Sequence, residues 1–144
     1  MDERQSDSLK FPESYRYSDE HIWMELVDEG NIRCGVTEYF CEKTEEIITV
    51  EFVKNIINME LFSGEAVLEV ESLKDSIVIK TPASGIVIEI NDLCVETPEI
   101  INNDPYGEGW LFLIVCNNFY EYEDLMHSDE YEYLVIKEKE NMYF

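Results

Sequence analysis

Short runs of apolar and β-branched residues, separated by turn-forming residues, recur along this chain. In the middle, residues 66–71 (AVLEVE) and 77–80 (IVIK) alternate apolar and polar positions, as half-buried strands do. Runs rich in the same residue types follow or precede them at residues 47–52, 86–90 and 110–115. Turn clusters separate such runs by about 8–12 residues, a spacing typical of β-sandwiches and barrels. The pattern predicts an all-β, β-rich domain with short helices.

Two segments have a helical pattern instead. Residues 38–46 combine small apolar gaps with a run of acids and predict a short helix, and the acidic, aromatic stretch after Asn117 predicts a C-terminal helix. Residues 54–62 look irregular, and 102–109 predict a long ordered loop. We expect a flexible segment over residues 1–14, one domain over 15–135 and a C-terminal tail over 136–144.

The two central strands are joined by residues 72–76, a short polar connection with Lys74 at its centre. Strands joined this closely should pair as an antiparallel hairpin, which places Lys74 at an exposed tip. A lysine amine can anchor an acyl group through an amide bond, and group carriers are tethered in this way. Position alone does not separate this role from that of an ordinary solvated lysine in a turn.

Charge narrows the range of partners. The chain has 33 acidic and 10 basic residues and a formal net charge of −23. Such a surface repels phosphate, so we expect no nucleic-acid partner and no anionic membrane partner. The acidity favours partners with basic docking surfaces, although a merely solvated surface would have the same composition. With 45% hydrophobic residues the chain can still bury a core.

Signals of compartment and metal binding are mostly negative. The first fifteen residues lack an apolar segment, so we expect no secretory or transit peptide and a cytoplasmic protein. The cysteines form no C-x-x-C pair, and neither His21 nor His127 lies at ligand spacing from one of them, so we predict no metal site. We expect their thiols to be buried and inert, although Cys41, in the predicted helix, could be exposed. The four cysteines are Cys34, Cys41, Cys94 and Cys116.

Motifs typical of catalytic sites are also absent from the sequence. No nucleophile elbow and no glycine-rich phosphate loop occurs, and acid pairs are expected on any surface this acidic. We therefore predict that the chain is not an enzyme by itself. Trp23 and Trp110 are interpreted as core anchors, and Tyr106 as a plug in its loop. His21 is either a structural histidine or part of a docking site.

Beside these observations stands a resemblance. Residues 70–74 (VESLK) resemble the lipoylation motif V-E-S-V-K of the glycine cleavage system H-protein family. Further matches follow the family's order with almost no gaps, over about residues 15–135. They are found at residues 17–23 (YSDEHIW), 35–38 (GVTE), 47–51 (IITVE), 63–65 (SGE), 81–85 (TPASG) and 98–111 (PEIINNDPYGEGWL).

This resemblance implies a flattened β-sandwich of the lipoyl/biotinyl hammerhead type with a C-terminal helix. It implies lipoate in amide linkage on Lys74, and recognition of Glu71 during lipoylation. Biotin is the rival group, but biotinyl domains usually have Met on both sides of the lysine, where this chain has Leu73 and Asp75. The implied role is an aminomethyl carrier between glycine decarboxylase, aminomethyltransferase and dihydrolipoyl dehydrogenase, supplied by lipoylating enzymes.

Some positions depart from the family pattern. Asp75, Ser76 and Ile77 stand where small residues usually follow the lysine, and Glu45 replaces a usual glycine. The usual Pro and Gly are also missing from residues 53–57. These departures leave an alternative open, in which an H-like paralogue relays lipoyl groups or sulfur intermediates in a different pathway.

Overall fold

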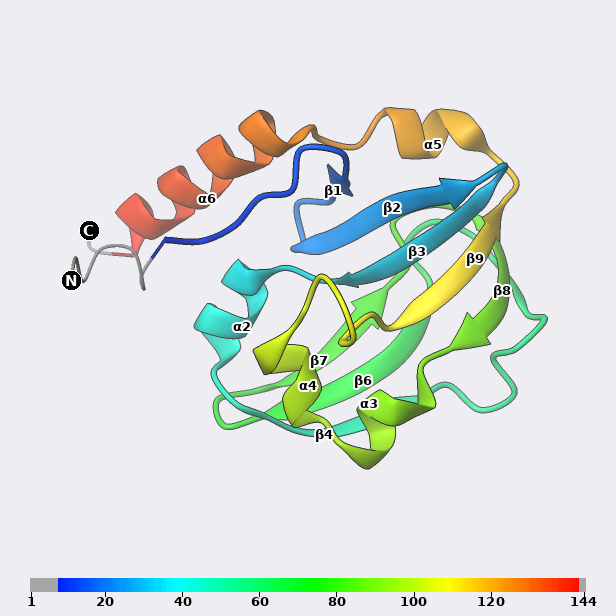
Figure 1. Cartoon of the computed structure of the whole chain (residues 1–144), viewed down its shortest axis with the longest axis horizontal. Coiled ribbons are helices and arrows are strands. Elements are labelled where there is room, and N and C mark those ends of the chain that lie inside the picture. The colour runs from blue at the N-terminus through cyan, green and yellow to red at the C-terminus, as the bar shows by residue number, and fades with distance from the viewer. Residues whose placement is uncertain (1–7, 143–144) are drawn as a thin grey trace.

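Two antiparallel sheets form the body of the molecule in the computed structural model, which describes residues 8–142 (Figure 1). One sheet has six strands, in the order β1 (Arg16–Tyr17), β2 (Ile22–Asp28), β3 (Asn31–Val36), β9 (Phe112–Cys116), β8 (Gly85–Ile90) and β5 (Glu60–Leu61). The other has three, in the order β4 (Ile47–Phe52), β6 (Ala66–Ser72) and β7 (Ser76–Lys80). The predicted β-rich fold is confirmed, and the irregular segment before residue 62 contains the short strand β5.

The main core lies between the sheets and follows from alternation along their strands. In β6, Leu68 and Val70 are buried while Glu69 and Glu71 are exposed on the opposite face. Their inward side chains belong to the same cluster as Met24 of the larger sheet. Burial of this face fixes the register of β6 against its neighbours, because a slip of one residue would move the glutamates into the core.

Within residues 8–142, five helices complete the fold: α2 (Glu38–Thr44), α3 (Asp92–Glu96), α4 (Glu99–Asn103), α5 (Phe119–Glu123) and α6 (Ser128–Asn141). The predicted helix over 38–46 ends at Thr44, and the C-terminal helix is confirmed. The sequence did not indicate α3 and α4, because five residues are too few for a helical period. Residue 102, expected to begin a loop, lies inside α4.

A second, aromatic cluster holds α6 against the larger sheet. Its buried members are Tyr17, Trp23, Tyr39, Tyr131 and Val135. Figure 1 shows α6 beside β1 and the N-terminal segment, whose residues Leu9 and Phe11 pack against the same cluster. Part of the segment expected to be flexible over residues 1–14 is therefore packed, whereas residues 1–7 lie outside the described residues. The expected tail boundary at 135 falls within α6, and residues 143–144 are also outside the described part.

Most residues interpreted as structural do occupy the interior. Trp23 is fully buried, but Trp110 is only partly so, and the Arg33 guanidinium lies 5.9 Å from its ring centre. The interpretation of Trp110 as a core anchor is therefore only partly right. Three cysteines are buried, including Cys41, and Cys116 is half-buried. Burial raises the pKa of Cys41 and of Cys94 to about 12, so these thiols are poorly reactive.

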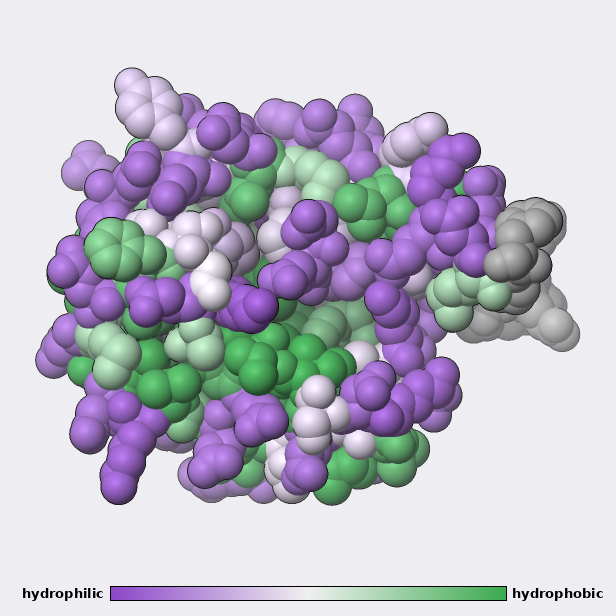
Figure 2. Space-filling model, turned by 180° about the vertical axis from the view of Figure 1, so that it is seen from behind, coloured by the Kyte–Doolittle hydropathy of each residue, from purple (hydrophilic) through white to green (hydrophobic). Residues whose placement is uncertain are grey.

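Hydrophilic side chains cover most of the face seen in Figure 2 and surround a band of hydrophobic ones. Within residues 8–142, none of the helices combines the length and apolarity needed to cross a membrane.

Candidate functional site

Lys74 lies at the tip of the β6–β7 hairpin, where the sequence pattern predicted it. The last paired residues are Glu71 and Ser76, so the turn between the strands presents the lysine beyond the sheet. Its side chain is 54% exposed. An amine in this position is open to a modifying enzyme, and a group attached to it can leave the protein surface.

Ser72 keeps the backbone of this tip in place. Its N–H donates to the carbonyl of Asp75 at 2.8 Å, and its Oγ accepts from the N–H groups of Lys74 at 3.2 Å and Asp75 at 3.1 Å. A serine hydroxyl that accepts from residues two and three positions ahead is a common way of stabilising a tight turn. The backbone that bears the lysine side chain is therefore held in place.

The tip also contacts the loop between α2 and β4. The N–H of Leu73 donates to the carbonyl of Glu46 at 3.0 Å, and Lys74 Nζ lies 3.3 Å from Glu45 Oε2. Both charged side chains are about half exposed, so the pair itself stabilises the fold by about 0–1 kcal/mol at most. The sequence does not indicate this contact, although Glu45 stands where the family usually has glycine.

Glu71, expected to take part in recognition by lipoylating enzymes, is exposed on the outer face of β6 three residues before the lysine. Thr49 on the neighbouring strand β4 donates to its carboxylate at 3.0 Å. On the same face Glu51 and Glu69 are directly opposed across the β4–β6 pair. The surface next to Lys74 is thus acidic. Like charges directly opposite each other on paired strands repel, which lowers the stability of the pair.

His21 lies apart from the tip, in a buried polar network beneath α6. Its Nδ1 is 2.8 Å from the Tyr131 hydroxyl, which is 2.7 Å from Thr37 Oγ1, and its Nε2 is 3.3 Å from a Glu138 oxygen. A proton on Nε2 satisfies this arrangement, because Nδ1 then accepts from Tyr131 while Nε2–H faces the carboxylate. His21 therefore has structural partners on both sides, as its structural interpretation requires.

We expect this network to make the stability of the protein sensitive to acid. Burial lowers the pKa of His21, and the charge of Lys43, whose Nζ lies 2.7 Å from Glu138, lowers it further. The carboxylate of Glu138 has the opposite effect but does not outweigh burial. Below pH about 6.5 the unfolded chain binds a proton that the folded chain resists, so the stabilising effect of neutral His21 is lost as the pH falls. We expect up to about 2 kcal/mol less free energy of unfolding at pH 5 than at pH 7 from this group.

Urea unfolding of the protein and of His21→Gln at both pH values measures this contribution as the difference between their pH slopes. His127→Gln, which removes an exposed histidine, is the matched control and should keep the wild-type slope. Equal slopes for wild type and His21→Gln would show that His21 does not resist protonation.

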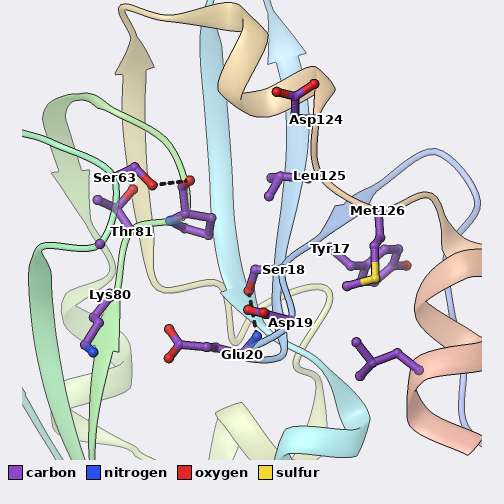
Figure 3. Close-up of a pocket in the computed structure, with 13 residues that line it drawn as sticks. Tyr17, Ser18, Asp19, Glu20, Ser63, Lys80, Thr81, Asp124, Leu125 and Met126 are labelled. Atoms are coloured by element: carbon purple, nitrogen blue, oxygen red, sulfur yellow. Dashed lines mark hydrogen bonds between the residues drawn. The ribbon is translucent and has the colours of Figure 1, made fainter. Parts of the chain in front are cut away.

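A surface pocket of about 540 Å³ lies at the opposite end of β7 from Lys74. Figure 3 shows Lys80 and Glu20 pointing toward the same space, with a hydrogen bond from Ser63 to the Pro82 carbonyl on its rim. Its apolar wall includes Leu125 and Met126. The pocket does not include Lys74, so the exposed amine and the pocket are separate features of the hairpin.

Comparison with known proteins connects the whole domain to one family. The family model described as glycine cleavage H-protein matches residues 15–138. A glycine cleavage system H protein from Psychrobacter cryohalolentis is 37% identical over 123 residues, covering 84% of this chain and 94% of that protein. One from Coprothermobacter proteolyticus is 32% identical over 127 residues, covering 88% and 98%.

A solved structure agrees with these sequences. The crystal structure of a glycine cleavage system H protein from Mycobacterium marinum aligns with a TM-score of 0.75 at 29% identity, covering 83% of this chain and 94% of that one. Fold and sequence thus agree along nearly the full length of these relatives. The chain with Lys74 at its hairpin tip belongs to the glycine cleavage H-protein family.

Proposed function

We propose that Lys74 carries lipoate in amide linkage and that the chain is thereby the lipoyl-carrying shuttle of the glycine cleavage system. Family membership makes the chain a carrier subunit of that system and not a catalyst itself. The observation that supports Lys74 as the attachment site is its exposed amine on a fixed hairpin tip. The prediction that this chain is not an enzyme agrees with its family.

The residues around the amine fit a lipoyl group. The tip presents Lys74 between Leu73 and Asp75, both exposed, so an attached acyl chain has free space on either side. Neither neighbour is the methionine expected beside a biotinylated lysine, which favours lipoate. When bound, lipoate supplies a strained cyclic disulfide that can accept a group on sulfur and store two electrons.

The tip then determines how far the carried group can move. From bond lengths, a lysine side chain with a lipoyl group reaches on the order of 10–15 Å. We expect the arm to enter the active sites of glycine decarboxylase, aminomethyltransferase and dihydrolipoyl dehydrogenase in turn, after attachment by lipoylating enzymes. The acidic body, with its net charge of −23, would meet basic surfaces around those sites. We place this work in the cytoplasm.

A second candidate is an H-like relay that passes lipoyl groups or sulfur intermediates to other enzymes. It is favoured by the residues after the lysine, where Asp75, Ser76 and Ile77 replace the usual small residues, with Asp75 and Ser76 exposed beside the amine. A partner that reads this part of the hairpin would meet a different surface from the usual one.

Reconstitution separates the two candidates. The lipoylated protein is mixed with glycine decarboxylase, pyridoxal phosphate and glycine, and its intact mass is followed. We expect glycine-dependent addition of an aminomethyl group to the lipoyl arm, and no addition when glycine is left out. A fully lipoylated protein that gains no such mass, beside a Psychrobacter H protein that does, would exclude the glycine cleavage role and favour the relay.

A further inference from the structure

We propose that Glu45 is a positioning residue for Lys74, which holds the unmodified lysine against the α2–β4 loop and releases it when the amine is acylated. This inference rests on the proposed function, in which Lys74 is the acylated residue. Its basis is the 3.3 Å contact between Lys74 Nζ and Glu45 Oε2, together with the unusual backbone that presents this carboxylate.

The backbone of Glu45 is in a conformation that few residues with side chains adopt. Glu45 follows α2 as its C-cap with φ 66° and ψ −149°, a combination found almost exclusively in glycine. Residues persist in such conformations only where their surroundings hold them, and they gather at functional sites. The backbone of Glu45 is thus strained, whereas glycine would adopt this conformation without strain.

Neighbouring groups hold Glu45 on both sides. Its N–H donates to the carbonyl of Cys41 at 2.8 Å, and its carbonyl accepts from Asn102 Nδ2 at 3.0 Å. The same amide accepts from the N–H of Ile47 at 2.9 Å, so one side chain spans the loop. One residue on, Glu46 accepts from the N–H of Leu73 at 3.0 Å. The loop that bears the carboxylate is therefore fixed to the hairpin tip.

Acylation changes this contact in a defined way. The amine nitrogen forms a bond to the carbonyl carbon of an activated acyl donor, and the bond from that carbon to its leaving group breaks with its electron pair. The ammonium loses two protons in becoming an amide N–H. The product has no charge at nitrogen, so the attraction to Glu45 disappears and the arm is no longer held at the loop.

The same contact restrains the unmodified lysine. The carboxylate of Glu45 holds Nζ at the loop, where the amine is less available to an acyl donor than it would be if the side chain moved freely. Removing the carboxylate should therefore make Lys74 more reactive toward a small acylating reagent. Because both side chains are about half exposed, the change should be about two- to fivefold, as expected for a pair in water.

Competitive labelling of the unmodified protein tests this inference. Wild type and Glu45→Gln are treated with a trace of acetyl N-hydroxysuccinimide ester, and the labelling of Lys74 relative to that of Lys80 is read by peptide mass spectrometry. We expect a two- to fivefold higher ratio in Glu45→Gln. In 1 M salt the two proteins should converge, because the Debye length falls to about 3 Å. A merely structural effect would not depend on salt in this way.

Two further variants complete the test. Glu46→Gln removes the neighbouring carboxylate of the same loop and should label as wild type does. Glu45→Gly removes the carboxylate and suits the backbone conformation, so it should match Glu45→Gln without loss of stability. Equal labelling of wild type and Glu45→Gln, or slower labelling of the variant, overturns the proposal. The reagent needs no lipoylating enzyme, so this outcome is distinct from a failure of Lys74 to receive lipoate.

Discussion

Lys74→Arg should abolish attachment of lipoate while leaving the fold unchanged. Arginine keeps the positive charge beside Glu45 and fits an exposed tip, but its guanidinium stays protonated and does not form the amide. Intact mass of the protein purified from a host that lipoylates it should show one lipoyl addition in wild type and none in the variant. The effect is complete, because the other six lysines lie outside this turn.

Lys80→Arg is the matched control for this experiment. Lys80 belongs to the same hairpin, is exposed, and ends strand β7 away from the tip. It should acquire lipoate as wild type does. If Lys74→Arg were fully lipoylated, or if only Lys80→Arg lost lipoylation, the attachment site would not be Lys74. Either result would remove the main support for the proposed function.

Leu68→Ala should destabilise the protein by about 2–5 kcal/mol. Leu68 is 1% exposed in the middle of β6, the strand that leads to Lys74, and lies in the core between the two sheets. Removing its side chain leaves a cavity that neighbouring residues from both sheets can fill only in part. The free energy of unfolding from urea titration measures the loss, and the slope of the transition should stay unchanged.

The comparison for Leu68 lies on the same hairpin. Val78 of β7 is 47% exposed on the outer face, so Val78→Ala should cost well under about 1 kcal/mol. If both variants lost equal stability, burial between the sheets would not be what holds the hairpin in place. Leu68→Ala should still be lipoylated at temperatures where it is folded, because the turn itself is unchanged.

The features that could be predicted from the sequence are those with local causes. Alternation in residues 66–71 indicated strand β6, and the short polar connection after it placed Lys74 at a hairpin tip. The glycine-containing turns and β-branched runs indicated most of the remaining strands for the same reason. In a strand with one buried face, the alternation of apolar and polar residues shows which side chains are buried, so the strand can be predicted without knowing its partners in the sheet.

Other features depend on contacts between distant segments. Glu45 contacts Lys74 only because the α2–β4 loop lies beside the hairpin, and the sequence pattern of neither segment predicts this contact. Trp110 is partly buried because it packs against the aromatic cluster, whose members include Tyr17 and Tyr131 from distant parts of the chain. The sequence predicts a flexible segment at Leu9 and Phe11, but both pack against an aromatic cluster that includes Tyr131 of the C-terminal helix, and Phe11 contacts its ring.

The hydroxyl of Tyr131 joins α6 to Thr37, the residue that caps α2 by accepting from the N–H of Phe40. Helix α2 is only seven residues long, and its other end is Glu45 beside the lysine. Helix α2, about 10 Å long, therefore has the contact with α6 at one end and the contact with Lys74 at the other. A substitution of Tyr131 would consequently act at one end of the helix whose other end meets the hairpin tip at Lys74.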